Sequence, residues 1–329
     1  MKNFKLKSYL LKVTLALVIA IFPTQSIVAQ DVDSVLLSEV SNGDVEAAKK
    51  LLLAAGVSVD DEASVSSITQ GILQLVITNA QSTTIQSTIE AAVASITQAV
   101  FQLATEAELS PEETTTAVEA TAQGALTAVV AAPTVTEASL SAAVAASAKG
   151  ATSGAMLAAS AAQQDSTVTA VSVAEAAKAA TEGSMIALAT LVEEDKPLSV
   201  VVDAVQAAAA GASQAAVATA VAVNADPATI VTAVATSVET GADSISEDNG
   251  VSVVINEAVS SGVQQGTLTG ANEAGITGEA ATELAGEAQA AADEASSNDS
   301  DSGDSDTPDP VTSNPEDDNE VEASPSTGA

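Results

Sequence analysis

Residues 207–216 read AAAAGASQAA, a run of small side chains with Gly211 near its middle. Alanine has the highest helix propensity of any residue, so this run predicts a helix. Variants of the phrase recur along the chain at intervals of 25 to 30 residues. Their central residues are Gly71, Ala99, Gly124, Gly154, Gly183, Gly211, Gly241 and Gly266. A period of this length is typical of an array of helical units.

Polar or proline-bearing turns separate these units between residues 63 and 275. They fall at 79–81, 109–111, 132–134, 164–166, 195–197, 225–227 and 248–250. Ser110-Pro111 and Asp226-Pro227 are typical of helix starts, because Ser or Asp caps exposed N–H groups and proline tolerates the first helical position. Glu112 and Glu113 would then lie at the positive end of their helix, where negative charge is favourable.

Apolar residues within the units recur at steps of three and four, which places them on one face of a helix. Three such sets are Val118, Ala122 and Ala125; Val201, Val205, Ala208 and Ala212; and Val231, Val234, Val238 and Ala242. We therefore predict an all-α fold, an Ala/Val-rich array of helical hairpins similar to an α-solenoid. The valines and threonines leave an all-β fold as an alternative, although no unit sustains an alternating pattern.

Each unit has two possible forms. It is either one long helix with glycine at its middle, or two short helices with glycine at the corner. Glycine inside a helix costs about 1 kcal/mol relative to alanine, whereas a corner uses the conformational freedom of glycine. We therefore prefer the hairpin, and in both forms the small residues let neighbouring backbones approach closely.

The composition removes most catalytic chemistry. The chain has 329 residues, no His and no Cys, and its nine basic residues are all lysines. These absences exclude Ser–His and Cys–His nucleophile pairs, disulfides, and imidazole or thiolate metal ligands. The neighbouring carboxylates at Glu112–Glu113 and Glu193–Asp195 are expected to be solvated caps rather than a general acid and base. We expect no enzyme, no catalytic residue, no cofactor and no metal site.

The N-terminal 29 residues have the layout of a secretory signal peptide. Lysines lie within residues 2–12, an apolar run of ten occupies 13–22, and Pro23 and the small residue Ala29 follow. An uncleaved membrane anchor is the alternative, but a span takes about 20 residues. We predict cleavage, a secreted or cell-envelope location (periplasm or extracellular space), and no later segment that spans a membrane.

The remainder of the chain is strongly acidic. Four of the nine lysines precede residue 13, so five lysines face 44 acids after residue 29, a net charge of −39. Such a surface repels nucleic acid and anionic lipid, so no nucleic-acid partner is expected. We expect a protein or extracellular surface as the partner, and self-association by end-on stacking remains open.

Residues 34–62 include SVLLSEVSNGDVEAAKKLLLAAG, which resembles one ankyrin repeat. The resemblance implies two short antiparallel helices joined by a turn at 42–44, with Gly56 in a left-handed conformation after the second helix. It also implies an inner face of Val45, Ala48, Leu51 and Leu52, stacking of such helix pairs on one another, and binding of protein partners. We assign residues 30–62 as an ankyrin-like helical cap on the array at 63–275, with Lys49 and Lys50 on its solvated side.

The C-terminal end loses the repeating pattern. Residues 276–295 are rich in alanine and glutamate and predict one terminal helix that closes the stack with a polar face. Residues 296–329 hold ten acids and no base, which predicts a disordered acidic tail. Weak calcium binding through the tail aspartates Asp299, Asp301, Asp304 and Asp306 is a lesser hypothesis, because the glycine and closing glutamate of a calcium loop are missing.

These features favour an exported, non-enzymatic structural, scaffold or interaction protein of the cell surface or extracellular matrix. The alternative is a protein that binds ice, hydrocarbon or a hydrophobic solid. That alternative depends on a stripe of threonines in one unit, Thr229, Thr232, Thr236 and Thr240.

Overall fold

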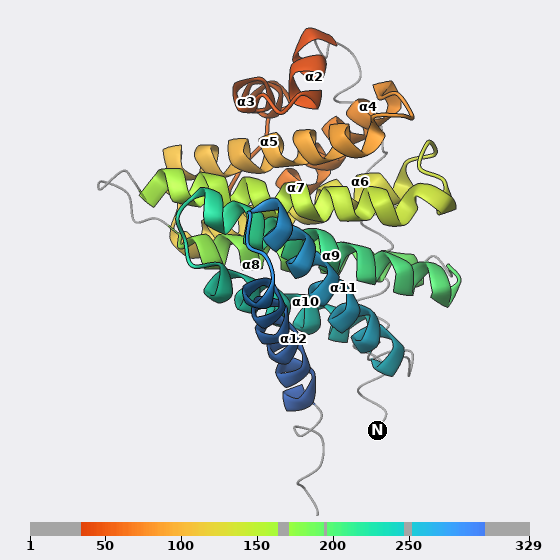
Figure 1. Cartoon of the computed structure of the whole chain (residues 1–329). Coiled ribbons are helices and arrows are strands. Elements are labelled where there is room, and N and C mark those ends of the chain that lie inside the picture. The colour runs from red at the N-terminus through yellow and green to blue at the C-terminus, as the bar shows by residue number, and fades with distance from the viewer. Residues whose placement is uncertain (1–33, 164–170, 194–195, 247–251, 300–329) are drawn as a thin grey trace, which may run out of the picture.

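The computed structural model describes residues 34–163, 171–193, 196–246 and 252–299 (Figure 1). These residues form eleven helices and no strand, so the all-α prediction is confirmed and the all-β alternative is wrong. The leader at 1–29 and residues 300–329 of the tail lie outside the described residues. The helices are α2 (Ser34–Ser41), α3 (Val45–Ala54), α4 (Glu62–Asn79), α5 (Ile85–Glu106), α6 (Pro111–Ala131), α7 (Glu137–Gln163), α8 (Val173–Glu193), α9 (Leu198–Ala222), α10 (Pro227–Ser246), α11 (Ser252–Glu273) and α12 (Glu279–Asp299).

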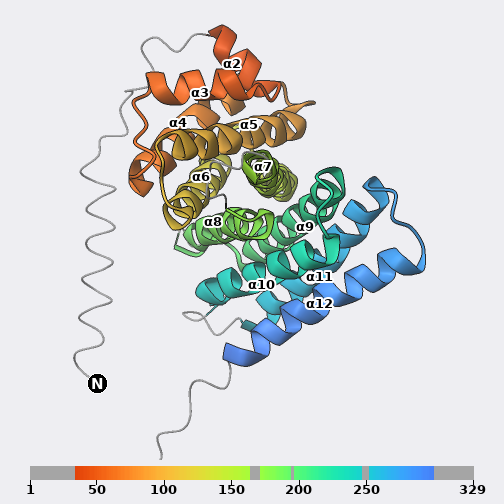
Figure 2. The ribbon, with the colours of Figure 1, turned by 90° about the vertical axis from the view of Figure 1, so that its left-hand side faces the viewer.

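The long helices alternate between two layers. From α4 to α11, each helix packs most extensively against a helix two places away along the chain rather than against its neighbour. Helices α5, α7, α9 and α11 form one layer, called here the odd layer, and α4, α6, α8 and α10 form the even layer (Figures 1 and 2). The interior lies between these layers, and apolar faces at steps of three and four residues supply it.

Glycine lies inside the long helices, so the preference for a hairpin with glycine at its corner is wrong. Gly211 is in the middle of α9, and a Cβ atom there would lie 2.2 Å from the carbonyl oxygen of Ala145 on α7. Gly124 on α6 faces the carbonyl oxygen of Ser66 on α4 in the same way, at 2.2 Å. The packing of the layers therefore needs a residue without a side chain, which outweighs the helix propensity lost at glycine.

Helix α11 repeats this contact along one face. Gly262, Gly266 and Gly270 follow one another at intervals of four residues and so lie on the same side of the helix. Their Cβ positions would meet the carbonyl oxygens of Gln206, Ala210 and Gln214 on α9 at 2.4, 2.2 and 2.5 Å. The two helices thus run in contact over three turns, with backbone against backbone.

The interior is lined mainly by alanine and valine. All the inner-face residues predicted around Val118, Val201 and Val231 are buried. Larger side chains fill a few places, among them Phe101, Met156 and Met185, each at most 2% exposed. Burying one methyl or methylene group contributes only about 0.8 kcal/mol, so stability comes from many small contacts.

The predicted helix starts are confirmed. Ser110 caps α6: its hydroxyl accepts from the Glu113 backbone N–H at 3.3 Å, and the Glu113 carboxylate accepts from the Ser110 backbone N–H at 2.8 Å. At α10, the Asp226 carboxylate accepts from the Thr229 backbone N–H at 3.2 Å, immediately before Pro227. Where the predicted turns fall on described residues, they lie at the junctions between successive helices and overlap a helix by at most one residue.

An ion-pair network ties three helices of the odd layer together. Lys149 Nζ on α7 lies 3.3 Å from Glu90 Oε1 on α5 and 3.6 Å from Glu273 Oε2 on α11. Gln214 on α9 donates its side-chain N–H to the other oxygen of Glu273 at 2.6 Å. The Lys149 and Glu273 side chains therefore link α7 with α11, and Gln214 adds α9 to the network.

Helices α2 and α3 form a short antiparallel pair that packs on α5. Gly43 in the turn and Gly56 after α3 have φ values of 87° and 76°, which favour glycine. Leu51 and Leu52 are buried as expected. The prediction for Lys49 is wrong: its side chain is only 17% exposed because it pairs with Glu106 at the end of α5.

Helix α9 is long and apolar enough to cross a membrane, which the sequence analysis did not anticipate, but 61% of its most apolar stretch is buried between neighbouring helices.

Helix α12 lies against both α10 and α11 at the end of the molecule (Figure 2). It buries Ala281, Leu284 and Ala288 and leaves its glutamates exposed.

Candidate functional site

A polar groove of about 560 Å³ runs between α11 and α12. We call it the α11–α12 groove. It is lined by Val253, Asn256, Glu257, Ser260, Ser261 and Gln264 of α11 and by Gln289, Asp293 and Ser296 of α12. Eight of these nine residues are polar or charged, although the interface between two packed helices is normally apolar. The groove is therefore an exception to the Ala/Val packing of the other helix pairs.

Three side-chain hydrogen bonds cross the groove. Asn256 donates from Nδ2 to Ser296 Oγ at 2.6 Å, and Gln264 donates from Nε2 to Gln289 Oε1 at 3.3 Å. Between them, the Ser260 hydroxyl donates to Asp293 Oδ1 at 2.8 Å. The α11 residues are four apart, as one helix face requires, and their α12 partners follow in reverse order because the helices are antiparallel.

Glu239 of α10 lies beside one end of this groove. It is only 1% exposed, and both of its carboxylate oxygens are buried. Burial raises the pKa of Glu239 to about 7, and repulsion from Asp243 and Asp293 adds to the increase, while contact with the Ser296 hydroxyl partly offsets it. Asp293 and Ser296 also line the groove, whereas Glu239 itself is not among the lining residues.

A second buried acceptor belongs to the groove itself. The side-chain oxygen of Asn256 has no hydrogen-bond partner, because the amide uses its nitrogen for Ser296. A buried polar atom left unsatisfied costs about 1–3 kcal/mol. Asn256 therefore carries this cost at the wall of the groove.

The chemistry of the groove suits binding. Ser260 bonds to a carboxylate, but a serine nucleophile needs a stronger base, such as the histidine that this chain does not contain. No group of three or more acidic residues among the described residues is close enough to hold a metal ion. What the groove offers is an excess of hydrogen-bond acceptors and negative charge.

A second hollow, of about 410 Å³, lies between α6 and α8. It is lined chiefly by Glu112, Glu119, Glu175, Lys178 and Glu182. Burial raises the pKa of the half-buried Glu119, with repulsion from Glu182 and then Glu62. Lys178 Nζ lies 3.6 Å from Glu182 Oε1, so part of the negative charge is already paired.

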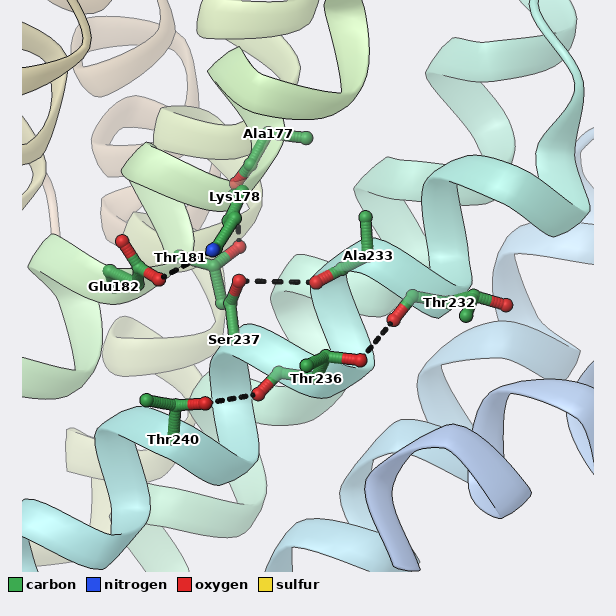
Figure 3. A network of polar contacts seen from close by, with 9 residues as sticks. All are labelled: Ala177, Lys178, Thr181, Glu182, Thr232, Ala233, Thr236, Ser237 and Thr240. Carbon is green, nitrogen blue, oxygen red and sulfur yellow. Dashed lines mark hydrogen bonds and ion pairs between the residues drawn. The ribbon is translucent and has the colours of Figure 1, made fainter. Parts of the chain in front are cut away.

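The threonine stripe of α10 lies on the surface, with Thr229 and Thr240 exposed and Thr232 and Thr236 half-buried. Figure 3 shows that the hydroxyls of Thr236 and Thr240 turn back onto their own helix. Thr236 and Thr240 donate to the carbonyl oxygens of Thr232 and Thr236, each at 3.0 Å. The hydroxyl protons of Thr236 and Thr240 are therefore already engaged, and Thr229 donates its own to Asp226 Oδ2 at 2.6 Å.

The carboxylates singled out in the sequence occupy separate places. Contact with the Ser110 hydroxyl and backbone N–H lowers the pKa of Glu113, as suits a helix cap. Glu194 and Asp195 lie outside the described residues, as do Asp301, Asp304 and Asp306 of the calcium hypothesis.

Sequence reasoning missed Glu239. The spacing of apolar residues could have indicated that Glu239 is buried. It lies four residues after the buried Ala235 and three before the buried Ala242, on the inner face of its unit. Its proximity to α12 could not be read from that spacing.

Comparison of the chain with known protein families, curated proteins and solved structures found no match.

Proposed function

We propose that this protein is an exported, non-enzymatic scaffold or interaction protein of the cell surface or extracellular matrix. The observation that carries the proposal is the series of glycine-to-carbonyl contacts along both layers, from Gly124 to Gly270. An interior packed this closely has low compressibility, so the helices keep fixed positions relative to one another. A platform of fixed shape is suited to holding a partner by contact.

Further features support this assignment. The two-layer alternation is consistent with an α-solenoid-like array, and α2–α3 with its resemblance to an ankyrin repeat would cap the first end. The lysine-rich start of the chain and its apolar run support export, and the acidic tail would keep the array in solution. The net charge of −35 favours partners with basic or neutral surfaces over nucleic acid.

Fractionation of the producing cells tests export. We expect intact-mass measurement of the extracellular or envelope fraction to find a chain that lacks residues 1–29. Recovery of the protein from the cytosol with those residues still attached would contradict the proposal.

A sedimentation assay tests contact. Purified mature protein is mixed with isolated cell envelopes or matrix, and the bound fraction is compared with that of an acidic protein of similar size. We expect saturable binding that heat-unfolded protein does not show. Binding no greater than that of the acidic control would refute a scaffold role at this surface.

The second candidate is binding to ice or an apolar surface through the α10 stripe. It is favoured by one observation: the hydroxyl protons of Thr236 and Thr240 are engaged within the helix, which lowers the cost of removing water from this face. Ice shaping and hexadecane adhesion would be measured for the protein and for Thr240→Glu. Activity that the charged variant loses supports this role, and equal behaviour of the two proteins excludes it.

A further inference from the structure

We propose that α12 is an exchangeable cap: it moves away from the array as a unit, and α12 of a second copy of the chain takes the place that it leaves. The exchange is reciprocal, so two copies form a closed pair. The proposal goes beyond the scaffold role, because it assigns one helix to self-association. Its test uses the purified full chain and does not depend on export or on any envelope partner.

The apolar contact that holds α12 is small. Among the buried side chains in the described part of α12, only Leu284 is larger than alanine; the others are Ala281, Ala285, Ala288 and Ala292. By comparison, α11 buries Ile255, Val259 and Val263. Because the free energy of burial grows with the apolar area removed from water, α12 is held more weakly than α11.

The glycine of α12 does not join it to the array. A Cβ atom at Gly286 would meet nothing within 4 Å, whereas Gly262, Gly266 and Gly270 hold α11 against the backbone of α9. Gly286 is also exposed, so it faces away from the helices that α12 packs on. Helix α12 therefore lacks the backbone contact that joins α11 to α9.

The contact between α12 and α11 is polar. The hydrogen bonds from Asn256, Ser260 and Gln264 cross the α11–α12 groove, and those from Ser260 and Gln264 are exposed. Water replaces the partners of an exposed bond when the two helices separate, so the net contribution of such a bond is small. The groove of about 560 Å³ also leaves space between the helices. Separation is therefore easier here than between α9 and α11.

A hinge lies directly before α12. Gly278 is exposed, has a φ of 68°, and would meet nothing within 4 Å if it carried a Cβ atom. Ile276 is half-buried, and its backbone N–H donates to the carbonyl oxygen of Ala271 at 2.8 Å, which holds it to the end of α11. Glycine takes many backbone conformations at little cost, so rotation at 277–278 moves α12 while α11 stays in place.

The vacated place fits α12 of a second copy. Helix α12 lies against α10 and α11 at the edge of the molecule, where a second chain can approach (Figure 2). The same helix from another copy makes the same contacts, so the exchange costs chiefly the freedom of two separate molecules. Because each copy gives one α12 and receives one, the exchange stops at a pair.

Cross-linking between two single-cysteine variants tests the exchange. The chain contains no cysteine, so each variant carries one thiol. Full-length Gln264→Cys and Gln289→Cys chains are mixed at high concentration, incubated, diluted and treated with a short bis-maleimide. We expect mass spectrometry to find residue 264 of one copy linked to residue 289 of another, because these side chains are hydrogen-bonded across the groove.

Gln206→Cys mixed with Ser261→Cys is the matched control. Gln206 donates to Ser261 Oγ at 3.0 Å, so this pair also loses one exposed hydrogen bond, but it joins α9 to α11 and does not involve α12. The control mixture should give less of the corresponding product by about tenfold or more, because the closely packed α9 and α11 stay together within one chain. Equal yields from the two mixtures would overturn the proposal, since random collision would then explain the product.

A further substitution in both chains of the first mixture identifies the part that moves. Leu284→Ala should speed the exchange by about tenfold or more, because the loss of a buried leucine side chain destabilises the closed cap. Leu140→Ala on α7 is the control, since Leu140 is 8% exposed and Leu284 is 7% exposed. It should change the rate by less than about twofold, because α7 does not move in the exchange. Equal acceleration by both substitutions would indicate exchange through unfolding of the whole chain and would refute the proposal, as would a rate that Leu284→Ala leaves unchanged.

Discussion

Replacing Gly211 by alanine tests the close contact between α7 and α9. The new Cβ atom would lie 2.2 Å from the carbonyl oxygen, 2.9 Å from the carbonyl carbon and 3.0 Å from the Cα of Ala145. All three are backbone atoms, so no flexible side chain can move away. An ordinary contact between a methyl carbon and an oxygen is about 1 Å longer than the first distance, so the two helices must separate.

The expected magnitude follows from two opposing effects. Overpacking a close-packed interior costs about 1–3 kcal/mol, and this site belongs at the upper end because the obstacle is backbone. The gain in helix propensity from glycine to alanine offsets about 1 kcal/mol. We expect a net loss of about 2 kcal/mol in the free energy of unfolding, or a decrease of roughly 4–8 °C in Tm for a chain of this size.

Gly286→Ala is the matched control. Gly286 also lies inside a helix, α12, but nothing within 4 Å would meet its Cβ atom. This variant should be more stable by about 1 kcal/mol, because only the helix propensity changes. Unfolding of both variants would be followed by circular dichroism with heat and urea. If Gly211→Ala is stabilised as much as Gly286→Ala, the close contact does not exist and the reasoning about the layers is wrong.

Three further outcomes are expected. The pKa of Glu239 is raised from 4.5 to about 7 in the folded chain, so the folded state holds a proton that the unfolded state releases. The contribution of this group to stability is fully present below pH 4.5 and is lost as pH rises through about 7. The loss is about 3 kcal/mol, and urea unfolding of Glu239→Gln should lack this slope; an unchanged slope would contradict the burial of the carboxyl group. Lys149→Met should cost up to about 1 kcal/mol in thermal unfolding at low salt and nothing measurable in 1 M salt, because its ion pairs are partly exposed. Ser110→Ala should cost about 1 kcal/mol through the loss of the α6 cap, whereas Ser110→Asp should retain most of the stability in the same assay.

The sequence predicted those features that depend on neighbouring residues. Ser110 and Asp226 determine where their helices begin through contacts within three residues, and the Val231 and Val234 pattern shows the buried face without knowledge of the partner helix. The all-α class, the inner faces and the turns on described residues were therefore predicted correctly.

Features that depend on distant residues were not predicted. The role of Gly211 is determined by Ala145, and the pairing of Lys49 is determined by Glu106. The isolated cost of glycine in a helix favoured the wrong form, because the compensating contact comes from another helix. Likewise, the burial of Glu239 depends on the packing of α10 against its neighbouring helices.

The alternation of layers restricts how the chain can change length. The glycines that meet a backbone carbonyl do so on a segment that precedes them by 56 to 66 residues, which is two units rather than one; they are Gly124, Gly150, Gly154, Gly183, Gly211, Gly262, Gly266 and Gly270. Deleting a single helix would move every later helix from its own layer to the other layer. Each of these glycines would then face a helix whose backbone is not exposed at the matching position. Deleting two consecutive helices would leave every later helix in its own layer. The chain can therefore grow or shrink only by even numbers of helices.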